Sequence, residues 1–293
     1  MTTSILASQP RGGFLVGLIG SGIGGSFSPQ LHETEAREQG FELHYRLIDA
    51  QQRGFSATDL PRLLDAMALV GFQGSNVTHP FKEAVLPSLG SLSDAAAAIG
   101  AVNTIVHDPA RGWVGHNTDW LGFVENFRRF LPGAAIDRVM LLGAGGAGAA
   151  IGYGMLRHGV GELIVCDSDK NKSSALRNKL ADLFGSARVR RIDAPREAMD
   201  RVDGVINATP IGMHGKPGTP FDVALLEPRL WVADIIYFPL QTALLQAATA
   251  CGCRILGGGG MVVFQAAEAF RLFTGVTADA ERMLRHFHRC VGE

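Results

Sequence analysis

The feature that most constrains the fold is a glycine-rich turn in the second half of the 293-residue chain. The turn reads Gly143-Ala144-Gly145-Gly146-Ala147-Gly148, fits the spacing G-x-G-x-x-G, and stands between an apolar run at 138–142 and a run typical of a helix. Asp167 comes 19 residues after the last of these glycines, at the end of the next apolar run. The glycine spacing alone is weak evidence for a nucleotide site. Its context is stronger, because the turn follows a strand, begins a helix, and is followed by a second strand that ends in an acidic residue. This order predicts a Rossmann unit that binds a dinucleotide.

Each part of this pattern has a physical role toward a dinucleotide. The glycines permit a tight turn, a close approach of the backbone to a pyrophosphate, and close packing of helix on strand, and the start of the helix offers free N–H groups to phosphates. A carboxylate at Asp167 accepts hydrogen bonds from ribose hydroxyls and repels a 2′-phosphate, which favours NAD over NADP. Two alternatives stay open: Asp167 as a helix cap or solvated loop residue, and Lys170 and Lys172 as cations that hold a 2′-phosphate.

Two alternating series of strands and helices divide the chain. The predicted strands lie at 14–19, 44–49 and 74–78 in the first series, and at 138–142, 162–167, 189–192, 204–209 and 231–236 in the second. Helices predicted over 261–273 and 278–290 follow the second sheet, and we expect them to pack back on the first half. The pattern predicts an α/β protein with an N-terminal open α/β substrate domain (1–118 plus 262–293) and a C-terminal Rossmann domain (119–261).

Composition and charge exclude several classes of function. Lys and Arg number 27 and Asp and Glu 28, so a net charge of −1 gives no electrostatic reason to bind nucleic acid or an anionic membrane. No apolar stretch approaches the ~18 residues of a membrane span. Residues 1–13 contain one Arg and no apolar run, so we expect no secretory signal and a cytoplasmic protein. Four cysteines without paired C-x-x-C spacing predict no metal site.

Lys82 and Asp119 are the strongest candidates for chemistry. Lys82 follows the β-prone segment 74–78 and a turn bent by Pro80. Asp119 lies at the boundary between the first and the second series of strands and helices. A lysine and a carboxylate from two sides of a crevice suit proton transfer to and from a hydroxyl beside a nicotinamide. Taken singly, a lysine is usually a surface charge and an aspartate after Asn-Thr is usually a helix cap.

Seven motifs then occur in a fixed order between about residues 14 and 275. They are Ser26-Phe27-Ser28-Pro29, Asn76-Val77-Thr78-x-Pro80-x-Lys82, Gly100-Ala101-Val102-Asn103-Thr104, Gly115-x-Asn117-Thr118-Asp119-x-x-Gly122, the Gly143–Gly148 turn, Asn207-Ala208-Thr209-Pro210-x-Gly212-Met213 and Gly260-Met261-Val262-x-x-Gln265. With these motifs the chain resembles the shikimate dehydrogenase family, including its quinate/shikimate dehydrogenase branch.

The resemblance implies a role for each matching residue. Lys82 and Asp119 correspond to the catalytic pair of the family, and Ser26 and Ser28 to the serines that hold the substrate carboxylate. The residues implied to contact ring hydroxyls or approach the substrate are Thr78, Asn103, Gln265 and Tyr237. The residues implied to bind the cofactor are Gly143 to Gly148, Asp167, Asn207, Thr209, Met213 and Gly258.

Two departures from the family pattern bear on the branch. The segment Gly20–Gly25 lacks the Pro and His that many members carry before the paired serines, and Asp167-Ser168-Asp169 replaces an Asn-Arg-Thr whose Arg grips a 2′-phosphate. Both departures favour the NAD-using quinate/shikimate or aminoshikimate-type branches over the biosynthetic NADP enzyme.

The reaction that the resemblance implies is reversible oxidation of a ring secondary alcohol of shikimate or quinate to the 3-dehydro ketone. A hydride goes to the nicotinamide, and the hydroxyl proton goes to Lys82. Whether Lys82 rests as a base or as a charged proton donor stays open, as does the oligomeric state, for which we consider a homodimer. The alternatives are a dehydrogenase of a modified shikimate such as aminoshikimate, and a non-catalytic homologue that senses the ligand.

Overall fold

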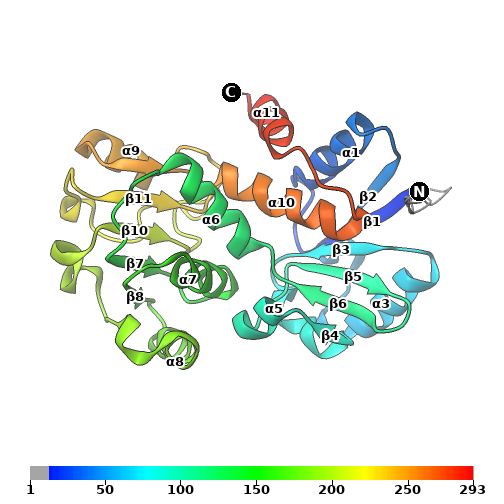
Figure 1. Cartoon of the computed structure of the whole chain (residues 1–293), viewed down its shortest axis with the longest axis horizontal. Helices are drawn as coiled ribbons and strands as arrows, with labels where there is room; N and C mark the ends of the chain where they lie inside the picture. Colours follow the sequence, from blue (N-terminus) through cyan, green and yellow to red (C-terminus); the bar gives the residue numbers. More distant parts are fainter. Residues whose placement is uncertain (1–12, 293) are drawn as a thin grey trace, which may run out of the picture.

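Two six-stranded sheets organise the chain, and the computed structural model describes residues 13–292 of it. The strand order is β2-β1-β3-β5-β6-β4 in the first sheet and β12-β11-β10-β7-β8-β9 in the second. The sheets lie in two lobes, and the helices α6 and α10 run between them (Figure 1). Residues 1–12, which carry the expectation about a secretory signal, lie outside the described residues.

The first sheet belongs to the N-terminal lobe, and its core strands are parallel. Its strands are β1 (Phe14–Gly20), β2 (Leu43–Asp49), β3 (Gly74–Val77), β4 (Ser91–Leu92), β5 (Thr104–Asp108) and β6 (Gly112–His116). β5 alone runs antiparallel to its neighbours β3 and β6. The helices of this lobe are α1 (Ser28–Glu38), α2 (Ala50–Arg53), α3 (Leu60–Leu69), α4 (Phe81–Ala84) and α5 (Asp94–Ile99). The predicted open α/β layer is confirmed, with the β5–β6 hairpin as an addition.

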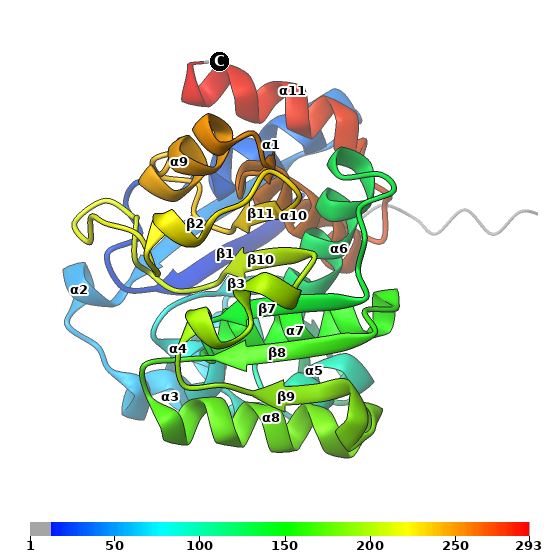
Figure 2. The ribbon, with the colours of Figure 1, turned by 90° about the vertical axis from the view of Figure 1, so that its left-hand side faces the viewer.

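The second sheet is parallel throughout. Its strands are β7 (Arg138–Leu142), β8 (Glu162–Cys166), β9 (Val189–Arg191), β10 (Gly204–Asn207), β11 (Trp231–Asp234) and β12 (Arg254–Leu256). Helices α7 (Gly146–His158), α8 (Lys170–Phe184) and α9 (Ala243–Cys251) connect them, and Figure 2 shows α8 beside the β9 edge. The strand order reverses between β7 and β10, which is where doubly wound sheets bind ligands. The predicted Rossmann architecture is confirmed.

Two helices, α6 (Asp119–Phe130) and α10 (Gly259–Thr274), join the two lobes, and α11 (Ala280–Val291) packs against α10 and α1. The C-terminal helices pack back on the first lobe, as predicted: Phe270 and Phe273 of α10 lie in one apolar cluster with Val16 of β1. The domain boundaries after residues 118 and 261 stay a prediction, and α10 is continuous through residue 261. Between residues 13 and 292, no helix combines the length and apolar composition that a membrane span requires.

Candidate active site

Polar residues of the first lobe meet at one edge of its sheet. β3 and β6 end at this edge, and β5 begins there because it runs in the opposite direction. The backbone fixes the meeting point, since the Val77 N–H donates to the Asn103 carbonyl at 2.8 Å and the Asn103 N–H to that of His116 at 3.1 Å. Three sequence-distant motifs therefore converge at a single edge.

Lys82 and Asp119 lie in contact at this edge. Lys82 belongs to the short helix α4, Asp119 is the first residue of α6, and Lys82 Nζ lies 2.6 Å from Asp119 Oδ2. The side chains are 22% and 8% exposed, so the carboxylate is nearly covered while the ammonium keeps an open side. The other carboxylate oxygen, Oδ1, accepts a hydrogen bond from Asn103 Nδ2 at 2.9 Å. The pair is thus fixed in place with one cationic end accessible.

Asn103 connects this pair to the rest of the edge. Its Oδ1 accepts a hydrogen bond from the Thr118 N–H at 2.7 Å, and its Nδ2 lies 3.3 Å from Gln265 Oε1 on α10. The side chain of Asn117 also takes part, because its Oδ1 accepts from the Asp119 N–H at 3.1 Å. The structure therefore unites Lys82, Asn103, Asp119 and Gln265. Asn117 and Thr118 were missed as site residues, although they directly precede Asp119 in the sequence.

The remaining predicted substrate residues stand on separate segments of the two lobes. Ser26 Oγ and Ser28 Oγ are 3.2 Å apart at the start of α1. Thr78 follows β3, and a Cβ on Gly20 would come within 2.4 Å of its Cγ2, so glycine is needed there. Tyr237 follows β11 and is 37% exposed. Within residues 13–292, no hydrogen bond connects these four residues to the Lys82–Asp119 pair.

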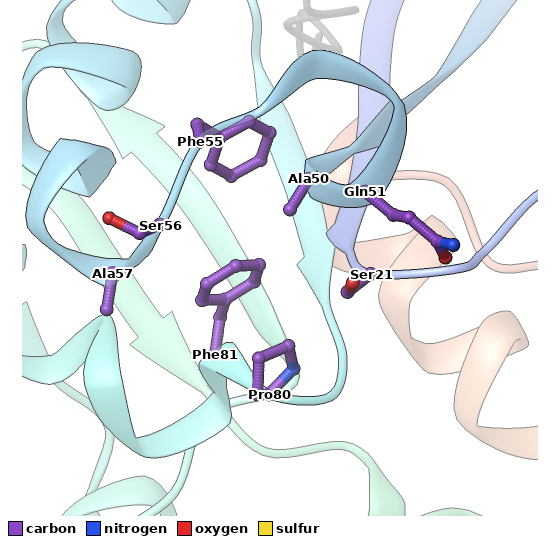
Figure 3. Close-up of a pocket in the computed structure, with 8 residues that line it drawn as sticks. All are labelled: Ser21, Ala50, Gln51, Phe55, Ser56, Ala57, Pro80 and Phe81. Carbon is purple, nitrogen blue, oxygen red and sulfur yellow. The ribbon is translucent and has the colours of Figure 1, made fainter.

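A surface pocket of about 440 Å³ opens next to the turn that precedes Lys82 (Figure 3). Its apolar part includes Phe55 and Phe81, whose ring centroids are 5.6 Å apart, and Pro80. None of the predicted substrate or catalytic residues lines it. We therefore do not place the substrate in this pocket.

The glycine-rich turn has the geometry that a dinucleotide requires. Gly143 has a φ of +99°, and a Cβ on Gly148 would lie 2.0 Å from the Gly143 carbonyl oxygen, so both positions need glycine. A Cβ on Gly145 would meet nothing within 4 Å, which leaves space above the start of α7. These residues fit a pyrophosphate at the N-terminus of α7.

Asp167 turns its carboxylate toward this loop. Its Oδ2 accepts from the Ala144 N–H at 2.7 Å, and its Oδ1 accepts from the Asp169 N–H at 2.8 Å. Asp169 is the residue that caps α8, through the N–H groups of Asn171 and Lys172. The alternative of Asp167 as the helix cap is therefore wrong. Oδ1 also accepts a long hydrogen bond from Ser168 Oγ at 3.5 Å, whereas Oδ2 keeps a further lone pair that a ribose hydroxyl can use.

The predicted residues on the nicotinamide side are held by a buried cluster. Asn207 is fully buried; its Nδ2 donates to Asp234 Oδ1 at 3.1 Å, and its Oδ1 accepts from Thr209 Oγ1 at 2.7 Å. Burial raises the pKa of Asp234, against hydrogen bonds that favour its charged form. Sequence reasoning missed Asp234, although it ends a strand. The cluster fixes the loop that leads to Met213, which is 41% exposed.

Gly258 lies where α10 begins. A Cβ at this position would come within 2.3 Å of the Ile235 carbonyl oxygen, just past the end of β11. The start of α10 can therefore approach this end of the Rossmann sheet only with glycine at position 258.

Known proteins resemble the chain along almost its whole length. Two family models match: the shikimate dehydrogenase substrate binding domain over residues 18–105 and the shikimate 5′-dehydrogenase C-terminal domain over residues 258–286. The shikimate dehydrogenase (NADP⁺) of Streptomyces avermitilis is 47% identical over 281 residues, which are 95% of this chain and 96% of that protein. The quinate/shikimate dehydrogenase (NAD⁺) of Corynebacterium glutamicum is 45% identical over 275 residues, 93% and 97% of the two chains.

A solved structure agrees with these relatives. The quinate dehydrogenase from Corynebacterium glutamicum in complex with NAD superposes with a TM-score of 0.88 at 44% identity, and the match covers 94% of this chain and 99% of that one. Two relatives more than 40% identical over more than nine-tenths of the chain establish its kinship. The chain belongs to the shikimate dehydrogenase family.

Proposed function

We propose that the protein interconverts shikimate, quinate or both with the corresponding 3-dehydro ketone by hydride transfer, with NAD as the preferred cofactor. The contact between Lys82 and Asp119, 2.6 Å long, carries this proposal. It places a proton-carrying amine beside a fixed carboxylate, in the lobe that faces the glycine-rich turn of the Rossmann sheet. The relatives named as shikimate and quinate/shikimate dehydrogenases support the substrate class.

The residues of the first lobe bind and orient the ring in this proposal. Ser26 and Ser28 donate hydrogen bonds to the substrate carboxylate from the start of α1. Thr78, Asn103 and Gln265 bond ring hydroxyls, and Tyr237 approaches from the second lobe. Because Asn103 also bonds Asp119, a hydroxyl bound there is placed close to the catalytic pair.

Lys82 moves the proton. In alcohol oxidation, the Lys82 amine accepts the proton of the reacting hydroxyl; in ketone reduction, its ammonium donates a proton to the oxygen that becomes the hydroxyl. Asp119 orients Lys82 by direct contact. A nicotinamide held by the glycine-rich turn would supply the acceptor for the hydride of the carbinol carbon.

The preference for NAD rests on Asp167. Its carboxylate stands at the end of β8 and contacts the Ala144 N–H, so a 2′-phosphate on the ribose would meet a negative charge. Ribose hydroxyls can donate to the same carboxylate. Relatives of both kinds, NAD⁺ and NADP⁺, match the chain at similar identity, so this preference needs a direct test.

Initial rates of nicotinamide reduction test the proposal, with shikimate and quinate each paired with NAD and NADP. We expect NAD with one or both acids to exceed the NADP pairs by about tenfold or more in kcat/KM, because the Asp167 carboxylate accepts ribose hydroxyls and repels a 2′-phosphate. A higher rate with NADP would refute the proposal that the Asp167 carboxylate makes NAD the preferred cofactor. No turnover with any pair would refute the reaction and leave an aminoshikimate substrate or a ligand sensor.

The proposal also covers the location of the enzyme in the cell and its oligomeric state. We expect the enzyme in the cytoplasm, which fractionation of the source cells checks. Sedimentation equilibrium, compared with the monomer mass of 31.2 kDa, decides between a monomer and the homodimer considered above.

A further inference from the structure

A cluster of charges stands beside Asp167 at the carboxyl edge of the Rossmann sheet. Asp193 follows β9, and its carboxylate forms ion pairs with two cations, Lys170 and Arg191. Lys170 Nζ lies 3.3 Å from Asp193 Oδ1, and the guanidinium of Arg191 contacts the same oxygen. One carboxylate therefore engages both cations.

The register of the sheet puts this cluster next to the predicted ribose site. β9 pairs in parallel with β8, Val165 stands opposite Arg191, and the Ile192 N–H donates to the Val165 carbonyl at 3.1 Å. Asp193 and Asp167 thus leave the ends of adjacent strands at the same edge. Dinucleotide-binding sheets hold the ribose at this place, and a nearby cation is what accommodates a 2′-phosphate.

Both cations are engaged by side chains of the protein. Arg191 is also fixed from α8, because its Nε donates to Ser173 Oγ at 3.0 Å. Lys170 is the first residue of α8 and is largely exposed, so the contact with Asp193 is what directs its ammonium. Hydrogen bonds from both cations hold the pKa of Asp193 below its usual range, which keeps this carboxylate charged at neutral pH.

We propose that Asp193 is a specificity-determining residue for the cofactor: it withdraws Lys170 and Arg191 from the place of a 2′-phosphate and so strengthens the preference for NAD. The inference rests on the proposed function and deepens it. Asp167 repels the phosphate, and Asp193 removes the cations that would compensate. Replacing Asp193 therefore changes the discrimination between the two cofactors more than the affinity for the shared part of the molecule.

Binding of two adenosine nucleotides to the intact protein tests this role without turnover. Calorimetry gives the affinities for 5′-ADP and 2′,5′-ADP, which differ by the 2′-phosphate. In Asp193→Asn, we expect the ratio of affinities to shift toward 2′,5′-ADP by about five- to tenfold at low salt, and less at high salt, because freed cations form screened, charge-assisted contacts with phosphate. A ratio that stays within twofold of the wild type overturns the proposal.

A matched control removes the same charge elsewhere in the same lobe. Asp200 is exposed, pairs with Arg201 at 3.5 Å, and lies just before β10 begins, away from the carboxyl edge. Asp200→Asn should leave the ratio of affinities as in the wild type. An equal shift in this variant would mean that net charge sets the ratio, and would overturn the role of Asp193.

A combined variant separates withdrawal of the cations from simple repulsion by the carboxylate. Asp193→Asn together with Lys170→Met and Arg191→Gln should lose the gain seen in Asp193→Asn alone. If the combined variant keeps the gain, repulsion alone explains it and the proposal fails. If the protein turns over neither shikimate nor quinate, the proposed reaction is refuted. The role of Asp193 is tested independently, because the nucleotide affinities are measured without turnover.

Discussion

Asn103 and His32 show two opposite ways of burying a polar side chain in the first lobe. Asn103 is 3% exposed, and it uses its amide to bond Asp119 and Thr118. His32 is completely buried on α1, and both of its ring nitrogens lack a hydrogen-bond partner among the described residues. It packs instead against the rings of Tyr45 and Phe270. Asn103 therefore organises the proposed site, whereas His32 makes the lobe sensitive to acid.

His32 should make stability fall as the pH is lowered. Burial lowers its pKa from 6.5 to about 3, so between these values the unfolded chain binds a proton that the folded chain does not. Stability contributed by the neutral ring is present above pH 6.5 and is lost as the pH falls toward 3. From about pH 7.5 to pH 5, the wild type should lose about 2 kcal/mol more unfolding free energy than His32→Leu.

Urea unfolding of both proteins across this range measures the difference. His44→Gln is the control, because His44 lies exposed on the neighbouring strand β2 and is in water whether or not the chain is folded. Parallel pH profiles for the wild type and His32→Leu would show that His32 is not buried in its neutral form.

At the scale of elements, the contact between α6 and α10 aligns the site. α6 carries Asp119 and α10 carries Gln265, so their packing sets the distance between two proposed site residues. Gly122 makes the close contact possible: a Cβ there would lie 2.7 Å from the Gln265 backbone nitrogen and 2.8 Å from the Met261 carbonyl oxygen. Close packing of α6 on α10 therefore explains why the last position of the G-x-N-T-D-x-x-G motif, Gly122, is a glycine.

Gly122→Ala should destabilise the protein although alanine favours helices. The added methyl group meets backbone atoms that cannot rotate away, so we expect a loss of about 1–3 kcal/mol in unfolding free energy, against the gain of up to ~1 kcal/mol typical of this change in open helices. Turnover should also fall, because Asp119 and Gln265 move apart. Thermal and urea unfolding measure the first effect, and initial rates the second.

Gly154→Ala provides a graded comparison on α7. Its Cβ would lie 3.1 Å from the Trp120 carbonyl oxygen and from Val124 Cγ2, a looser contact than at Gly122. We expect a smaller loss there and no specific loss of turnover. A Gly122→Ala protein as stable as the wild type would contradict the packing described for α6 and α10.

Elements with strong local patterns could be predicted from the sequence, and those that depend on distant partners could not. The apolar runs of β7, β8 and β10 and the C-terminal helices α10 and α11 stand within about two residues of where the sequence predicts them. β5 and β6 were missed because neither is a continuous apolar run, and each is held in the sheet by antiparallel pairing with the other. Likewise, the motifs indicated Lys82 and Asp119, but the bond between Asn103 and Gln265, 162 residues apart, follows only from the folded arrangement.

At the scale of the whole molecule, the two lobes are joined by α6, α10 and a direct polar contact. Lys179 on α8 donates from Nζ to the Ile99 carbonyl at 2.7 Å, at the end of α5 in the other lobe. The proposed hydride donor and acceptor bind to different lobes. Two lobes connected at few places are suited to hinge motion, which brings the two ligands together and excludes water.

We therefore expect the lobes to approach one another when both ligands are bound. Solution scattering should give a smaller radius of gyration with NAD and shikimate together than for the free protein. Lys179→Met should enlarge the radius of the free protein, because it removes the contact with Ile99, and should leave the liganded radius close to that of the wild type. Identical radii with and without ligands would contradict hinge closure.

The most direct test of the whole account is a single-turnover measurement of hydride transfer with Lys82→Met. Enzyme in excess over NAD is mixed with saturating shikimate or quinate, and formation of reduced nicotinamide is followed by absorbance. We expect the rate to fall by at least about 100-fold relative to the wild type, the loss typical of removing a general acid–base group, while substrate affinity changes little. A variant that keeps more than a tenth of the wild-type rate would contradict the assignment of Lys82 and Asp119 as the catalytic pair.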